Sequence, residues 1–360
     1  MIKLGERIGT YPQIGSYGLA FKYFFEKGLG IEYMMPPKMT QRTLALGEKY
    51  SPDSLCAPFK YMLGSYIEAI EKGANILIGL GGFCRLDFFF ELQRDIIKDY
   101  RDDLIFVNFS QTKASDIGAW YEKFKDINPD LSILKLAKAM PVLVRIIESI
   151  DEVEDYIRKN KAYGLDPRDF DKIYSKYLRS LEEIRDGKDL DNLHKKVMSS
   201  LENLPRKDLD QDIKIAIVGE YYTIMESFAN HYVEDFLIER SISLDRWVDF
   251  TNTLIKRPLD QMQERIKKYS AYDMGATNIF TIERALHAGE SSYDGIIHLR
   301  SMGCTPEIDA QAVLDNISRE FDIPILYLTY DSETTDIGIN TRLEAFYDMI
   351  TMKKRLKEVI

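Results

Sequence analysis

The chain has 360 residues, of which 45% are apolar and 29% charged, a composition typical of a globular protein with room for two domains. Its formal net charge of −10, without a long run of lysine or arginine, argues against nucleic acid as a partner. No segment approaches the ~20 apolar residues of a membrane-spanning helix, and no secretory signal is recognisable. We therefore expect a soluble, cytoplasmic protein that binds no membrane.

The first region, residues 1–115, alternates strand-like and helix-like patterns. The strands are predicted at residues 3–10, 31–35, 75–80 and 104–109, and the helices at 17–27, 40–49, 59–72 and 86–100. Strands that alternate with helices in this way favour a parallel sheet with right-handed crossovers. This region is therefore predicted to be an α/β lobe.

The middle region, residues 116–207, contains no convincing strand pattern. Apolar residues recur at helical spacing from Phe170 to Ile184 and again from Leu190 to Leu204. The spacing predicts a helical insertion or linker whose apolar stripes pack inside the protein. They are too short for a sustained coiled-coil seam.

The last region, residues 208–360, returns to the α/β pattern. Its strands are predicted at 212–219, 245–250, 295–299 and 324–330, and its helices at 228–240, 306–321 and 341–359. The whole chain is thus predicted to be an α/β protein with two parallel-sheet lobes and a helical segment between them.

Three cysteines, Cys56, Cys84 and Cys304, lie in similar local settings. Each directly precedes a predicted helix, whose N-terminus lowers the pKa of a thiol. A helix that follows a strand of a parallel sheet begins at the carboxyl edge of that sheet, where such sheets bind their ligands. Thiolates gathered from two lobes would suit an iron–sulfur or another metal centre. Buried, inert cysteines remain an alternative, as does a zinc site completed by His298 or His231.

Several stretches around these cysteines match a known family. The chain resembles the 2-hydroxyacyl-CoA dehydratase and benzoyl-CoA reductase superfamily, in particular its branch of acyl-CoA dehydratase activase-related proteins. The matching stretches are Pro52 to Lys60 (PDSLCAPFK), Gly219 to Tyr222 (GEYY), Gly303 to Glu307 (GCTPE), Ile323 to Leu326 (IPIL) and Gly338 to Phe346 (GINTRLEAF). The resemblance covers both α/β regions and is weaker in the helical middle.

This resemblance implies Rossmann-like or flavodoxin-like lobes and a [4Fe–4S] cluster held by Cys56, Cys84 and Cys304. It implies an anaerobic redox protein that takes single electrons from an ATP-dependent activase, with an acyl-CoA ligand at an open iron site. The alternatives are a non-catalytic electron carrier or accessory subunit, and a metal-free or zinc-binding module on the same scaffold. Whether the chain is itself an enzyme, and whether it forms a homodimer or a heterodimer, stays open.

Six further residues are candidates for contact with such a cluster or its substrate. They are Lys60 and Glu307 on the helical turns after two cysteines, Arg85 and Arg300 beside the predicted site, and Glu226 with Asn230 one helical turn apart. Helix capping, ordinary salt bridges and surface charge are the alternatives for these positions. The chain lacks the phosphate-binding motif G-x-x-x-x-G-K-[ST], so we do not expect it to hydrolyse ATP itself.

Overall fold

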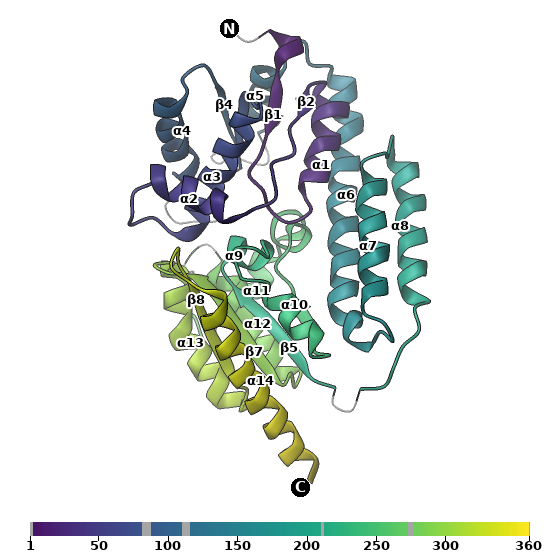
Figure 1. The fold of residues 1–360 in the computed structure, drawn as a ribbon, viewed down its shortest axis with the longest axis vertical. Coiled ribbons are helices and arrows are strands. Elements are labelled where there is room, and N and C mark those ends of the chain that lie inside the picture. Colours follow the sequence, from purple (N-terminus) through teal and green to yellow (C-terminus); the bar gives the residue numbers. More distant parts are fainter. Residues whose placement is uncertain are drawn as a thin grey trace. The chain divides into compact units, whose positions relative to one another are not determined.

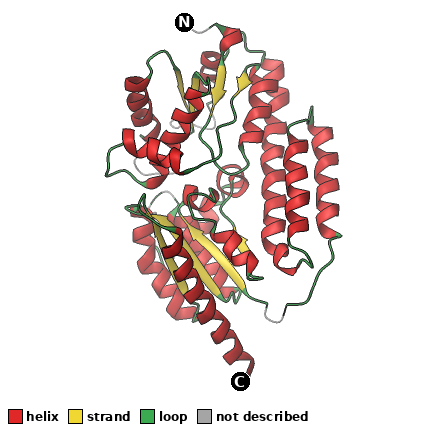
Figure 2. Ribbon diagram, in the orientation of Figure 1, coloured by secondary structure: helices red, strands yellow, loops and turns green. Residues whose placement is uncertain are grey.

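The computed structural model of the chain describes residues 3–80, 88–109, 116–209, 212–272, 275 and 277–359. The chain divides into two compact units. Unit 1 comprises Met1–Ile150 and Leu178–Asp191, and unit 2 comprises Asp151–Tyr177 and Asn192–Ile360. Figures 1 and 2 show that each unit contains a sheet with helices packed around it.

The sheet of unit 1 has four strands in the order β2-β1-β3-β4, and all its pairings are parallel. Its strands are β1 (Ile8–Thr10), β2 (Glu32–Tyr33), β3 (Ile76–Gly79) and β4 (Ile105–Asn108). The central strand β3 is buried along its whole length, as its apolar sequence predicted.

The helices of unit 1 follow the predicted pattern with one local difference. They are α1 (Gly18–Tyr23), α2 (Gln41–Tyr50), α3 (Ala57–Glu71), α4 (Phe89–Tyr100) and α5 (Ile117–Ile127), with a short 3₁₀ turn η1 (Leu4–Glu6) before β1. Where one helix was predicted over residues 17–27, α1 continues as a π-helical segment, η2 (Phe24–Leu29), which ends at a left-handed Gly30.

Helices α2 and α3 pack at a distance that only glycine allows. A Cβ on Gly47 would lie 1.9 Å from the carbonyl oxygen of Lys60, and one on Gly64 would lie 1.8 Å from that of Thr43. The two backbones therefore touch directly.

The middle of the chain is helical, as predicted. It forms α6 (Ile133–Asn160), the 3₁₀ turn η3 (Lys161–Tyr163), α7 (Arg168–Leu181) and α8 (Gly187–Glu202), and the described part of residues 116–207 contains no strand. The division between the two units runs through α6, α7 and α8. This division does not test the boundaries predicted after residues 115 and 207, which stay a prediction.

The sheet of unit 2 also has four parallel strands, in the order β6-β5-β7-β8. They are β5 (Lys214–Gly219), β6 (Ser243–Arg246), β7 (Gly295–Ser301) and β8 (Ile325–Tyr330). The helical elements are α9 (Tyr221–Met225), α10 (Val233–Glu239), η4 (Thr251–Lys256), α11 (Leu259–Ile266), α12 (Asn278–Glu290), α13 (Thr305–Phe321) and α14 (Asp336–Val359). With two parallel sheets and helices around them, the predicted α/β fold class is confirmed.

Three of these helices were missed by the sequence analysis. Helix α9 has only five residues, and α11 and α12 follow the β6 strand in a stretch for which no element was predicted. Yet α12 supplies much of the core: its Phe280, Ile282 and Leu286 pack with Ala216 of β5 and Ile296 of β7. None of the helices in the described ranges is long and apolar enough to cross a membrane.

Candidate functional site

Cys304 lies in a tight turn at the carboxyl end of β7. Gly303 adopts a left-handed backbone (φ +78°), and Cys304 is the residue at which α13 begins. The amide of Cys304 donates to the carbonyl of Ser301 at 3.1 Å, while that of Met302 donates to Tyr330 at 2.7 Å. The turn is thereby held against the ends of both β7 and β8.

Cys56 occupies the same kind of position in unit 1. It is the residue before α3, and the second helical residue is Pro58, as Pro306 is in α13. Both cysteines are partly buried. Because α3 leads into β3 of a parallel sheet, its N-terminus lies at the carboxyl edge of that sheet. Cys84 and its neighbour Arg85 lie outside the described residues.

Lys60 follows Cys56 on the first turn of α3 but points into the protein. Its side chain is only 9% exposed, and its ammonium lies 3.9 Å from the carboxylate of Glu48. Whether it contacts a cluster or a substrate stays a prediction.

Glu307, on the first turn of α13, faces the interior of unit 2. Its carboxylate accepts hydrogen bonds from the hydroxyls of Thr277 and Thr281, the latter at 3.0 Å, and from Nε2 of His298 at 2.8 Å. Glu307 and His298 are fully buried. All three donors lie inside the lobe, and through them the carboxylate anchors the first turn of α13, which directly follows Cys304.

A second carboxylate, Glu220, lies at the end of the neighbouring strand. Gly219 is left-handed (φ +132°), and a Cβ there would lie 1.9 Å from the carbonyl oxygen of Leu299. Glu220 accepts hydrogen bonds from the amides of Tyr222 at 2.9 Å and Thr223 at 2.8 Å, which caps α9.

Burial raises the pKa of Glu220, and the charge of Glu307 adds to this shift. The residue keeps some exposed surface, yet its carboxylate is enclosed. Two carboxylates, Glu220 and Glu307, thus follow the two central strands of the sheet. Glu220 was not singled out from the sequence, although a glutamate directly after a strand-ending glycine was a signal for it.

Glu226 and Asn230 lie in one turn between α9 and α10. The Asn230 side chain donates to the carbonyl of Thr223 at 2.9 Å and accepts from the amide of Val233 at 3.2 Å. Both residues are buried, with relative exposures of 7% for Glu226 and 2% for Asn230. Asn230 thus holds the turn together, and a role for the two residues in substrate binding stays a prediction.

Arg300 lies on β7, on the same face of the sheet as His298, because side chains two residues apart in a strand share a face. Its Nε is buried without a hydrogen-bond partner among the described residues. A guanidinium with an unsatisfied buried donor near the carboxyl edge is chemically suited to an anionic group.

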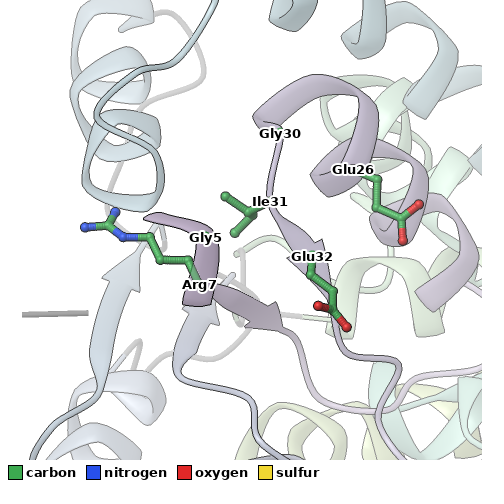
Figure 3. Close-up of a pocket in the computed structure, with 6 residues that line it drawn as sticks. All are labelled: Gly5, Arg7, Glu26, Gly30, Ile31 and Glu32. Carbon is green, nitrogen blue, oxygen red and sulfur yellow. The ribbon is translucent and has the colours of Figure 1, made fainter. Parts of the chain in front are cut away.

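Two hollows of the surface lie away from these residues. One, of about 390 Å³ in unit 1, is lined by Gly5, Arg7, Glu26, Gly30, Ile31 and Glu32. Figure 3 shows that its charged side chains point in different directions. The other, of about 290 Å³, lies at the amino edge of the unit 2 sheet, beside Lys214 and Ser243. Neither presents a converging set of reactive groups.

A metal-ligand cluster is not found in the ranges that the structure describes, where no three His, Cys, Asp or Glu side chains gather suitably. Because those ranges leave out Cys84, they do not test the three-cysteine site. Cys56 and Cys304 belong to different units, and each is described only within its own.

Comparison with known proteins identifies the family. The family described as 2-hydroxyglutaryl-CoA dehydratase, D-component, matches residues 19–350, which is nearly the whole chain. No curated protein matches significantly. The match spans both α/β regions and the helical segment between them. The chain therefore belongs to the family of the 2-hydroxyglutaryl-CoA dehydratase D-component.

Proposed function

We propose that this protein is the cluster-bearing component of a 2-hydroxyacyl-CoA dehydratase system, with a [4Fe–4S] cluster held by Cys56, Cys84 and Cys304. The observation that carries the proposal is the shared setting of Cys56 and Cys304 in a chain of this family. Each is partly buried and precedes a helix with proline as its second residue.

The chemistry of this setting suits iron ligation. The unpaired amides at a helix N-terminus carry partial positive charge, which stabilises a thiolate over a thiol. The left-handed Gly303 has open space where a Cβ would lie, so backbone amides can approach an inorganic sulfide there. These residues fit a cysteine-ligated cluster.

When bound, such a cluster would supply one-electron transfer and, with three protein ligands, an iron with an open position for substrate. The protein's own residues would bind and orient the acyl thioester. Arg300 offers a cation with an unsatisfied donor for an anionic part of the ligand. Glu307 holds the first turn of α13, and with it the backbone of Cys304.

The protein would receive its electrons from a separate partner, an ATP-hydrolysing activase. The absence of the phosphate-binding motif from this chain supports a division of labour between the two proteins. Mixing the oxidised protein with such an activase, ATP and a strong reductant should produce a reduced-cluster signal in electron paramagnetic resonance. Omission of ATP is the control.

Anaerobic purification followed by iron, sulfide and zinc analysis tests the proposal directly. We expect about four irons and four sulfides per chain, as the cluster type requires. Each of Cys56→Ala, Cys84→Ala and Cys304→Ala should lose the cluster, because a shared site needs every ligand. Met302→Ala, an exposed neighbour of Cys304, is the matched control and should retain it.

Three outcomes would contradict the proposal. The first is a colourless protein without iron, and the second is zinc in place of iron. The third is iron loss from only one of the cysteine variants, which would mean that the three thiols do not share a centre.

A further inference from the structure

His231 and Asp336 form a hydrogen-bonded pair in unit 2. His231 lies in the crossover between α9 and α10, and Asp336 is the first residue of α14. Nδ1 of the imidazole bonds to the Asp336 carboxylate. The ring also stacks on Tyr330, with ring centroids 5.8 Å apart and an interplanar angle of 15°. Two contacts thus fix the orientation of the imidazole.

The backbone that presents this ring is unusual. His231 and Tyr232 are both left-handed, with φ of 58° and 56°, although neither is glycine. Such residues are strained and persist only where the surrounding structure holds them. The amide of Tyr232 donates to the carbonyl of Ser227 at 2.9 Å, which closes the turn.

The second ring nitrogen of His231 is available. Nε2 makes no hydrogen bond to any residue in the described part of the chain, and the side chain keeps 11% of its surface exposed. An imidazole oriented by a carboxylate on one nitrogen and accessible on the other is the arrangement of a general acid–base group.

The other three histidines have different surroundings. His298 is fully buried against Glu307. His194 pairs through Nε2 with Glu152, at 3.2 Å on the helical surface. His287 lies within α12 beside Ser291, at the weak distance of 3.5 Å. Of the two histidines that pair with a carboxylate and keep exposed surface, His231 is the one at the carboxyl edge of the unit 2 sheet.

The pair lies at the same sheet edge as Cys304. Tyr330, on which the ring stacks, is the last residue of β8 and lies opposite Ser301, the last residue of β7. The amide of Met302 donates to the carbonyl of Tyr330, two residues before Cys304. The imidazole and the cysteine therefore follow neighbouring strands at the edge where parallel sheets bind ligands.

We propose that His231 and Asp336 are a proton-transfer dyad for the dehydration, which rests on the function proposed above. That reaction class removes hydroxide from C2 and a proton from C3 of a 2-hydroxyacyl thioester. The C3 hydrogen is not acidic in the thioester itself, so the step uses the single electron of the proposed function. The reduced thioester releases hydroxide from C2, Nε2 of His231 then takes the C3 proton, and the electron is given up again as the C2–C3 double bond is completed. The proton passes to the hydroxide, which leaves as water, so the reaction has no net oxidation or reduction.

Two measurements on the unreacted protein test the dyad without any catalytic assay. Nitrogen-15 NMR of labelled histidine should show His231 protonated on Nδ1, and Asp336→Asn should remove that preference. Diethyl pyrocarbonate, which acylates unprotonated imidazole, should modify His231 at Nε2, and modification at Nδ1 would contradict the pairing of that nitrogen with Asp336. A His231 protonated on Nε2 in the unsubstituted protein, or one unaffected by Asp336→Asn, would overturn the dyad.

The catalytic test uses the cluster-bearing protein with its activase and a 2-hydroxyacyl-CoA. His231→Asn is the variant chosen because asparagine tolerates a left-handed backbone, and Asp336→Asn changes a side chain that is 77% exposed. We expect kcat to fall about 10²- to 10⁴-fold in His231→Asn, the usual contribution of a general acid–base group. His194→Asn is the matched control and should keep full activity.

The dyad and the proposed function can fail separately. If the unsubstituted protein contains no iron, the proposed function is wrong and the dehydration role of the dyad falls with it. If iron content is equal in all variants but His231→Asn is as active as His194→Asn, the dyad alone is overturned.

Discussion

Removal of the buried Glu307 carboxylate should destabilise unit 2 strongly. Glu307→Ala would leave the donors of Thr277, Thr281 and His298 without their acceptor in a fully buried site. The hydroxyl of Thr281 can turn to a backbone carbonyl of its own helix, but Nε2 of His298 has no other partner in the described structure. Breaking a buried pair in this way costs about 3–5 kcal/mol.

Glu307→Gln should cost less, for a reason that the structure makes specific. Glutamine can keep its oxygen toward Nε2 of His298 and turn its amide toward the threonine hydroxyls, which accept as well as donate. A hydroxyl proton that bonded to the carboxylate must then find another acceptor in the buried site. One unsatisfied buried donor costs about 1–3 kcal/mol, so the expected order is alanine worse than glutamine.

Urea unfolding followed by tryptophan fluorescence can measure the free energy of unfolding of unit 2 alone. The chain has two tryptophans, and Trp247 packs on Phe280 of α12 with ring centroids 5.4 Å apart. A Trp120→Phe background leaves Trp247 as the only reporter. Asp309→Asn, on the exposed face of the same helix, is the control and should change stability by no more than about 0.5 kcal/mol. A Glu307→Ala variant as stable as this control would refute the reasoning.

Three further predictions concern the same framework. Burial raises the pKa of Glu220, so the ionisation of this carboxyl opposes folding. The stability of Glu220→Gln relative to the unsubstituted protein should therefore increase as pH rises through that pKa. A stability difference that stays constant between pH 4 and 8 would contradict this. Gly64→Ala should destabilise unit 1 by more than about 3 kcal/mol, because its Cβ meets the backbone of α2. Gly118→Ala is the control and should be neutral or slightly stabilising. The fluorescence of Trp120 in a Trp247→Phe background measures both effects. Gly219→Ala should reduce the yield of folded protein at 37 °C, since the new Cβ would overlap the Leu299 carbonyl; a normal yield and an unchanged melting temperature would contradict that expectation.

Much of the framework could be predicted because it depends on short-range patterns. The buried strands β3, β5 and β7 are apolar runs, and the prolines after Cys56 and Cys304 mark helix starts that the structure contains. Helix α12 was missed because its sequence mixes buried threonine, asparagine and glutamate with apolar residues. Those polar side chains are buried because they bond to residues of other elements, and a periodicity argument does not include such partners.

Whether a polar pair beside Cys304 can be predicted depends on how far apart its two residues lie in the sequence. His298 and Glu307 are nine residues apart, on a strand and on the first turn of the next helix. Strand alternation places His298 on the face that α13 covers, so the pair was open to prediction from one strand–helix unit. His231 and Asp336 are 105 residues apart, the first in the crossover from β5 to β6 and the second at the start of the C-terminal helix α14. Their contact depends on the strand order β6-β5-β7-β8 and on two left-handed residues, and neither is encoded by any local pattern. A pair assembled from segments so far apart in the sequence is therefore visible only in the folded protein.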